Sequence, residues 1–195
     1  MKNVSVCAFV CIGILAAWQL VALSQSGPAP QIAFDIPKTD IDTLLKNAPP
    51  AVDQQLRVVD MGKYNLGVGV IHRERLAAQS AGPVSGPYHD STAEVYIVLS
   101  GSGVLTTGGT ITDKKPSANY NLLNGPGGNG VPGQGAYSRR LQPGDIVVIP
   151  PGVLHVWTEI PEQVTYLSVR PDPDRVLPGG YVNPLLLKNQ PAPVK

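Results

Sequence analysis

Little of the sequence is charged, and much of it is glycine and proline. Charged residues make up 15% of the 195 positions, against roughly 25% in a typical soluble domain. The 21 glycines and 20 prolines exclude a coiled coil or a helical bundle, because both residues interrupt helices. Disorder is excluded too, because 43% of the residues are hydrophobic and they occur in short β-branched runs. This composition predicts an all-β domain with many turns.

No charge of one sign is in excess. The chain has 15 basic and 14 acidic side chains, a formal net charge of +1, and no block of basic residues. Binding to nucleic acid depends on clustered lysine and arginine side chains that neutralise phosphates. We therefore expect no nucleic-acid partner for this protein.

A long hydrophobic run stands near the start of the sequence. Lys2 is followed by the apolar segment 4–23, and Ala22 and Ser24 place small residues where signal peptidase cleaves. The pattern predicts a signal peptide over residues 1–24 and export to the periplasm or the extracellular space. An uncleaved membrane anchor is the alternative, because about 20 apolar residues can span a bilayer.

Cysteine is confined to this segment, at Cys7 and Cys11. A mature chain that starts after Ser24 would contain none, which excludes a disulfide framework, a thiolate metal site and a cysteine nucleophile. Any metal ion must then be held by histidine and carboxylate side chains.

Beyond residue 24 the periodic segments have the pattern of strands, apart from one short helix expected at 40–47. Short runs rich in β-branched residues are separated by turns that contain glycine and proline, which is typical of a sandwich or a barrel. The runs are Gln55–Asp60, Tyr64–Arg75, Glu94–Leu99, Gly103–Thr107, Asp145–Ile149, Leu154–Glu159 and Val164–Arg170.

These runs predict one β-domain over residues 61–171. Residues 25–60 before it form an N-terminal arm that carries the short helix, and residues 172–195 after it form a proline-rich tail. Within the domain, residues 114–140 lack a strand pattern and predict a long loop. That loop either extends over the surface or acts as a lid over the mouth of a barrel.

Two of the three histidines stand beside strands in positions that could bring them together. His89 is followed by Glu94, and if residues 90–93 form a turn, both side chains can point to the same side. His155 follows the turn at 150–152 and starts another strand. The sequence thus places two imidazoles and a carboxylate at strand ends.

The residues around these positions resemble the two motifs of the cupin superfamily. The first motif reads G-x5-H-x-H-x4-E-x6-G, and His89, Glu94 and Gly101 match its second histidine, its glutamate and its last glycine. The second motif reads G-x5-P-x-G-x2-H-x3-N. Its matches are Gly144, Pro150, Gly152 and His155. The resemblance covers about residues 60–170 and implies a single cupin-type jelly-roll β-barrel.

Two positions depart from the family pattern. Pro87 stands where cupins have their first histidine ligand, and Glu159 replaces the final asparagine. The resemblance then implies the metal ligands His89, Glu94 and His155, a set that suits iron, manganese, zinc or nickel with open positions for substrate. The alternative is a site that no longer binds metal.

His72 could supply a fourth ligand in place of the missing histidine. It shares a strand face with Val68 and Val70, and we expect that face to point into the barrel. The alternative is a histidine that is hydrogen-bonded near the end of the barrel.

The resemblance to cupins implies either an enzyme or a binding protein. The favoured hypothesis is an exported, metal-dependent enzyme that acts on a small oxygenated molecule (a sugar, an organic acid or a phenol) as an oxygenase, isomerase or lyase. Glu159 is its candidate catalytic acid/base, unless it is a solvated rim residue. The alternative is a secreted, non-catalytic protein that binds a sugar-like molecule in the same barrel pocket.

The outward face of the run 94–99 is expected to need a cover. Val95, Ile97 and Leu99 are apolar where a half-solvated sheet would be polar. Either the N-terminal arm or a second subunit must lie over them. Because cupins are often dimers, the resemblance favours a homodimer.

Overall fold

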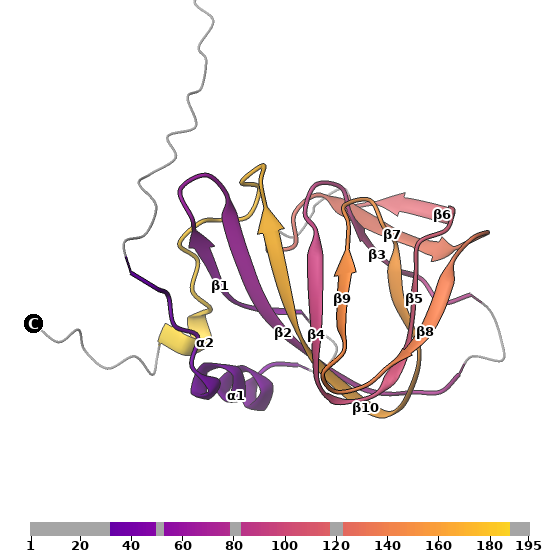
Figure 1. The fold of residues 1–195 in the computed structure, drawn as a ribbon, viewed down its shortest axis with the longest axis horizontal. Coiled ribbons are helices and arrows are strands. Elements are labelled where there is room, and N and C mark those ends of the chain that lie inside the picture. Colours follow the sequence, from indigo (N-terminus) through magenta and orange to yellow (C-terminus); the bar gives the residue numbers. More distant parts are fainter. Residues whose placement is uncertain (1–31, 50–52, 79–82, 118–122, 188–195) are drawn as a thin grey trace, which may run out of the picture.

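The chain folds into an all-β domain with two short helices on one side (Figure 1). The computed structural model describes residues 32–49, 53–78, 83–117 and 123–187. The helices are α1 (Lys38–Asn47) and α2 (Pro184–Leu187). The strands are β1 (Gln54–Asp60), β2 (Asn65–Leu76), β3 (Gly86–His89), β4 (Glu94–Gly101), β5 (Gly103–Thr107), β6 (Ile111–Pro116), β7 (Gly127–Pro132), β8 (Tyr137–Leu141), β9 (Ile146–Ile149) and β10 (His155–Asp172). This architecture confirms the predicted all-β class.

Strand β10 connects most of the sheet. Its first residues pair with β5, and its later residues pair with β2 on one side and with β4 on the other. The main sheet has the order β1-β2-β10-β4-β9, and β8 joins it next to β5. The second sheet, β3-β7-β6, is at the upper right of Figure 1. The two runs expected at 154–159 and 164–170 are therefore parts of one strand of 18 residues.

Aromatic and aliphatic side chains fill the interior of the barrel. The rings of Tyr96 and Tyr166 have centroids 4.5 Å apart, and those of Trp157 and Tyr166 are 5.5 Å apart. Aromatic pairs at such distances stabilise a core by about 0.5–1.5 kcal/mol beyond the burial of their area. The other buried members of this core are Ile71, Val98, Leu105, Leu141, Val147, Ile149, Ile160 and Val164.

The two helices pack on the outer face of β1 and β2. Leu44 of α1 and Leu186 of α2 are buried in a second apolar cluster with Leu56 and Val70. The residues after β10 return along β1, where the Asn183 N–H donates to the Leu56 carbonyl oxygen at 2.9 Å. The helices therefore cover the outer face of this end of the main sheet, and the returning segment pairs with the edge of β1.

The long loop expected at 114–140 is the main correction to the predicted fold. This segment contains the end of β6 and all of β7, and β8 lies mostly within it. The β7 sequence Gly-Gly-Asn-Gly-Val-Pro lacks polar–apolar alternation because its glycines serve close backbone packing. A Cβ on Gly127 would lie 2.1 Å from the Tyr88 carbonyl oxygen, and one on Gly128 would lie 2.3 Å from that of Lys115. Residues 118–122 lie outside the described residues.

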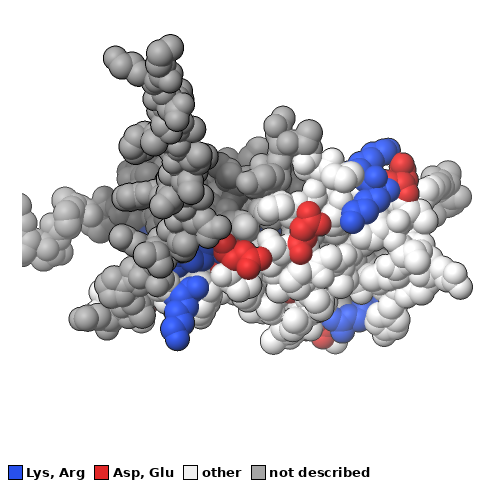
Figure 2. All heavy atoms as spheres, turned by 90° about the horizontal axis from the view of Figure 1, so that it is seen from above, with Lys and Arg blue, Asp and Glu red and all other residues white. Residues whose placement is uncertain are grey.

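The described surface carries no large patch of one charge on the face seen from above. Basic and acidic side chains are interspersed there, and most of the white surface between them is uncharged (Figure 2). No helix in the described part of the chain is long and apolar enough to cross a membrane. The predicted signal peptide at 1–24 lies outside the described residues.

Candidate metal centre

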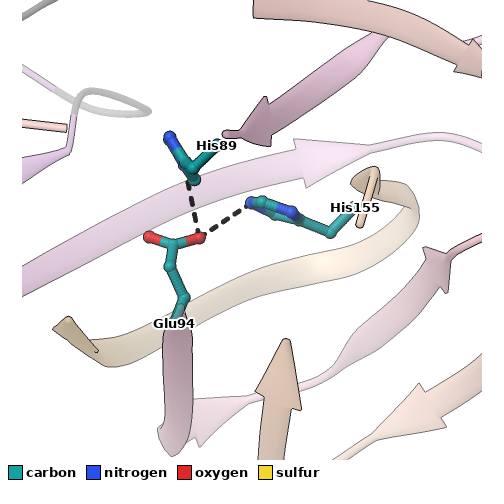
Figure 3. A group of neighbouring side chains, drawn as sticks. All are labelled: His89, Glu94 and His155. Atoms are coloured by element: carbon teal, nitrogen blue, oxygen red, sulfur yellow. Dashed lines mark ion pairs between the residues drawn. The ribbon is translucent and has the colours of Figure 1, made fainter. Parts of the chain in front are cut away.

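Three residues of the predicted site meet inside the barrel (Figure 3). His89 is the last residue of β3, Glu94 is the first residue of β4, and His155 is the first residue of β10. All three are buried, and their ligand atoms lie within 4.8 Å of one another. These side chains are therefore arranged to hold a metal ion.

Backbone contacts at one turn bring the ligands together. The Gly152 N–H, in the turn before β10, donates to the His89 carbonyl oxygen at 2.6 Å. Gly152 has a φ of +77°, in the left-handed region that favours glycine. Glu94 pairs with Ile149, the last residue of β9 before the same turn. The two motifs, distant in the sequence, thus meet at one point of the barrel.

One oxygen of the Glu94 carboxylate faces both histidines. Its Oε2 lies 2.8 Å from His155 Nε2 and 3.6 Å from His89 Nε2. The Tyr96 hydroxyl donates to the same oxygen at 3.1 Å. Burial, and then the Glu94 charge, raise the pKa of Tyr96 well above its ordinary value, so this hydroxyl keeps its proton. Oε2 is therefore the ligand atom of Glu94.

A buried arginine holds the other oxygen. Oε1 accepts a hydrogen bond from the Ser168 hydroxyl at 2.9 Å and pairs with the Arg170 guanidinium, which also contacts Asp53. Burial alone would raise the pKa of Glu94, but the Arg170 charge and the two imidazoles hold it well below its usual range. Burial would lower the pKa of Arg170, but the Asp53 and Glu94 charges raise it. Glu94 thus offers a carboxylate, not a carboxylic acid.

A backbone carbonyl orients the ring of His155. Its Nδ1 lies 3.0 Å from the Val153 carbonyl oxygen, and since a carbonyl only accepts, Nδ1 is the donor. Its Nε2 is buried and faces Glu94 Oε2 at 2.8 Å. A lone pair and a carboxylate oxygen at this distance repel each other unless a proton or a metal cation lies between them.

The charges and donors of the cluster fit a divalent cation. Two carboxylates, Glu94 and Asp53, surround one guanidinium, that of Arg170. With neutral histidines the cluster therefore has a net negative charge, which a cation would balance. Two imidazole nitrogens and one carboxylate oxygen are donors typical of iron, manganese, zinc and nickel sites with open positions. The residues present fit such a metal.

A cavity of about 330 Å³ lies next to the cluster and is lined by His155 and Tyr96. Its volume is in the range of small-molecule sites. Pro87 and Trp157 also line it. Pro87 has no ligand atom, so it forms an apolar part of the wall where the cupin pattern has a histidine.

His72 lies outside the cluster, which corrects its expected role as a fourth ligand. It does share a face with Val68 and Val70, but that face packs toward α1 and not into the barrel. Its Nδ1 lies 2.8 Å from the Thr165 hydroxyl. The barrel-facing residue at this point of β2 is the neighbouring Ile71. At this point β2 is buried on both faces, by Val70 toward α1 and by Ile71 toward the barrel core.

Glu159 also lies away from the cluster. Its Oε1 pairs with Arg140 at 2.6 Å, and its side chain is 30% exposed. It borders a separate cavity of about 370 Å³. The register of β10 against β5 shifts between Trp157 and Glu159, so Trp157 lines the cavity beside His155 and Glu159 does not. The expected acid/base is thus not brought to the metal centre.

Comparison with known protein families agrees with the motifs and the fold. The family model described as Cupin matches residues 62–178, more than half of the chain. The chain belongs to the cupin family. No curated protein matches this cupin in sequence.

Solved structures that resemble this cupin are distant in sequence. BH2720 from Bacillus halodurans is 13% identical, with a TM-score of 0.44, over 82% of this cupin and 98% of that chain. The EutQ protein of Clostridium difficile is 14% identical, with a TM-score of 0.36, over 72% of this cupin and 82% of that chain. The DMSP lyase DddQ from Ruegeria pomeroyi DSS-3 is 17% identical, with a TM-score of 0.31, over 54% of this cupin and 38% of that chain. Similarity at this level assigns no activity.

The residues that hold Glu94 Oε1 stand outside both cupin motifs, and the sequence patterns did not predict their role. A signal for both residues was present, however. In the run 164–170 the polar Ser168 and Arg170 stand two residues apart, alternating with the apolar Leu167 and Val169. A charged residue in phase with a buried strand face indicates a buried polar partner, because an unpaired charge there would be costly.

Proposed function

We propose that this cupin binds one divalent transition metal through His89, Glu94 and His155 and acts on a small oxygenated molecule in the adjoining cavity. The metal is iron, manganese, zinc or nickel. The substrate is a sugar, an organic acid or a phenol, and the reaction is of the oxygenase, isomerase or lyase type. The observation that carries the proposal is the buried cluster of His89, Glu94 and His155, whose ligand atoms lie within 4.8 Å of one another, next to the cavity that His155 lines.

The side chains around the ligands have separate tasks in this proposal. A bound metal would supply Lewis-acid or redox chemistry at the positions open to the cavity. Arg170 holds Glu94 Oε1 and so directs Oε2 toward the histidines. The Val153 carbonyl orients the ring of His155. Tyr96 donates to Oε2 and lines the cavity, so its hydroxyl is placed to hold a proton beside a substrate.

Metal binding by the purified protein tests this function. After removal of metal with a chelator, the protein is incubated with iron, manganese, nickel or zinc, and bound metal is measured by elemental analysis and calorimetry. We expect about one equivalent per chain. His155→Ala should weaken binding by about 10-fold or more. The matched control is His72→Ala, which replaces a histidine outside the cluster and should keep the wild-type affinity. Equal losses in both variants, or no metal bound by the wild type, would refute the proposal.

A second candidate function is non-catalytic binding of a sugar-like molecule in the same cavity. The position of Glu159 favours it, because this residue pairs with Arg140 and does not line the cavity beside His155. Incubation of the metal-loaded protein with a bound molecule separates the two functions. Recovery of the molecule unchanged favours the binding protein, and its conversion favours the enzyme.

We also propose a homodimer in which a second copy covers the outer face of β4 and β9. Leu99, Ile146 and Val148 on this face are 42%, 58% and 67% exposed. Strand β9 ends the order of the main sheet, so its outer edge has no neighbouring strand among those described. Light scattering after size exclusion should give a dimer mass for the wild type and a monomer mass for Val148→Lys. A monomeric wild type would rule out this assembly.

Export is likewise proposed, from the sequence pattern of residues 1–24. Mass spectrometry of the exported protein should give an N-terminus at Gln25. An intact Met1 on membrane-bound protein would favour the anchor instead.

A further inference from the structure

Arg73 places a positive charge in the wall of the cavity beside the metal centre. It lies on β2, two residues after the barrel-facing Ile71, and so on the same side of the strand. Its partly buried side chain lines the cavity of about 330 Å³ that His155 and Tyr96 also line. The cavity therefore combines a candidate metal ligand with a guanidinium.

No carboxylate of the described residues forms an ion pair with Arg73. Burial lowers the pKa of Arg73, but Tyr166, Tyr96 and the more distant Asp53 raise it overall, so the group stays charged. Asp53 is itself engaged by Arg170. A cation that is partly removed from water without a counter-ion is unfavourable, and an anionic ligand would compensate it.

The same cavity has N–H groups without acceptors. Arg73 Nε donates to the Tyr166 hydroxyl at 2.9 Å, and the two terminal nitrogens of Arg73 form no hydrogen bond to a described residue. Trp157 lines the cavity and is 5% exposed. Its indole nitrogen is fully buried beside the Tyr166 hydroxyl, so the free donors of the cavity wall are those of Arg73.

We propose that the molecule bound in this cavity carries an anionic oxygen group, a carboxylate or a phosphate, which the Arg73 guanidinium binds. The planar arginine fork donates to two oxygens of such a group at once. The inference rests on the proposed function for the place of the site, and it narrows the substrate class from oxygenated molecules to acids. Arg73 is then a specificity-determining residue.

The other charged residues at the cavity agree with an acidic ligand. The exposed Arg75 also lines the cavity and adds a second positive charge. Glu74 borders this cavity but also the one next to His72, on the opposite face of β2. Strand alternation directs the Glu74 side chain to that opposite face.

The test compares neutral, carboxylate and phosphate forms of the same carbon skeletons. The probes are glycerol, glycerate and glycerol 3-phosphate, and glucose, glucuronate and glucose 6-phosphate. Binding is measured by calorimetry and by tryptophan fluorescence of the full chain carrying Trp18→Phe, which leaves Trp157 as its tryptophan. Each titration is run on chelator-treated and on metal-loaded protein.

We expect at least one acid to bind and its neutral counterpart to bind at least about 10-fold more weakly. Arg73→Gln should remove this preference, while Arg73→Lys should keep part of it because the charge remains. The matched control is Arg140→Gln, an arginine that lies outside this cavity and should leave acid binding unchanged. A preference for glycerate and glucuronate would identify a carboxylate, and one for the phosphates would identify a phosphate.

Two outcomes overturn the inference: no acid binds, or Arg73→Gln keeps the wild-type preference while its melting temperature shows a folded protein. Metal binding is measured on the same samples, so the two proposals fail separately. Metal bound without acid preference would leave the proposed function and reject the role of Arg73. Binding of an acid through Arg73 by a protein that binds no metal would support the role of Arg73 and reject the proposed metal-dependent function.

Discussion

Replacing Glu94 by glutamine tests the buried charge network, because this change removes the charge and keeps the shape. Arg170, whose side chain is 2% exposed, would then keep only Asp53, whose side chain is 18% exposed. Breaking a buried ion pair by removing one partner costs about 3–5 kcal/mol. Because Asp53 remains, we expect Glu94→Gln to lower the free energy of unfolding by about 3 kcal/mol. For a domain of this size the melting temperature would fall by about 6–12 °C.

A double-mutant cycle separates the ion pair from general damage to the core. Arg170→Met removes the guanidinium and leaves Glu94 without its cation, so it should also be destabilising. The variant with both changes has neither charge, so it should be more stable than the sum of the single losses predicts, by about 1–3 kcal/mol.

The assay is urea unfolding of chelator-treated protein, followed by circular dichroism, so that bound metal does not contribute. The matched control is Glu159→Gln, the same substitution in the half-exposed pair with Arg140. It should cost less than about 1 kcal/mol. The charge network would be refuted if Glu94→Gln cost no more than this control, or if the two single losses added within about 0.5 kcal/mol.

Three further predictions concern Glu94, Gly127 and His72. The pKa of Glu94 is held well below 4.5, so the Glu94 charge stabilises the fold fully above about pH 4.5 and less as the pH falls toward the native pKa. The difference in unfolding free energy between wild type and Glu94→Gln, measured in urea, should therefore shrink below pH 4.5. Gly127→Ala should lower the melting temperature, since its Cβ would lie 2.1 Å from the Tyr88 carbonyl oxygen, whereas Gly144→Ala has open space and only the strain of its positive φ. His72→Ala should cost about 1 kcal/mol in urea unfolding, because it removes one side-chain hydrogen bond.

The sequence predicted most strands of the main sheet and missed β6, β7 and β8, of which β7 is half glycine. β5 was expected at Gly103–Thr107 and is found there, because its β-branched and aliphatic residues pack against the core. β7 was expected as part of a loop, because Gly127, Gly128 and Gly130 show no periodicity. Their role is to let β3 and β6 approach on both sides. Side-chain periodicity cannot predict a strand in which half of the residues are glycine.

The spacing within each motif predicted the three residues of the candidate metal centre. Both motifs place their ligands at strand ends, and the turn at Gly152 then brings His89 and His155 together. Arg170 and Asp53 were not predictable in this way, because Arg170 reaches Glu94 from a distant segment of the chain and Asp53 in turn contacts Arg170. These contacts depend on the order of the strands in the sheet, which the spacing of residues within a motif does not predict.

The case of His72 shows what alternation can and cannot decide. Alternation correctly placed His72 with Val68 and Val70, but it could not say which face points inward, because α1 covers one face of β2 and the barrel core the other. On β10 the pattern is inverted near the site: Leu167 and Val169 point outward, while Ser168 and Arg170 are buried and reach into the charge network around Glu94. A barrel strand whose polar residues are in phase with its buried face therefore indicates a buried charged site, even where no metal-ligand motif is present on that strand.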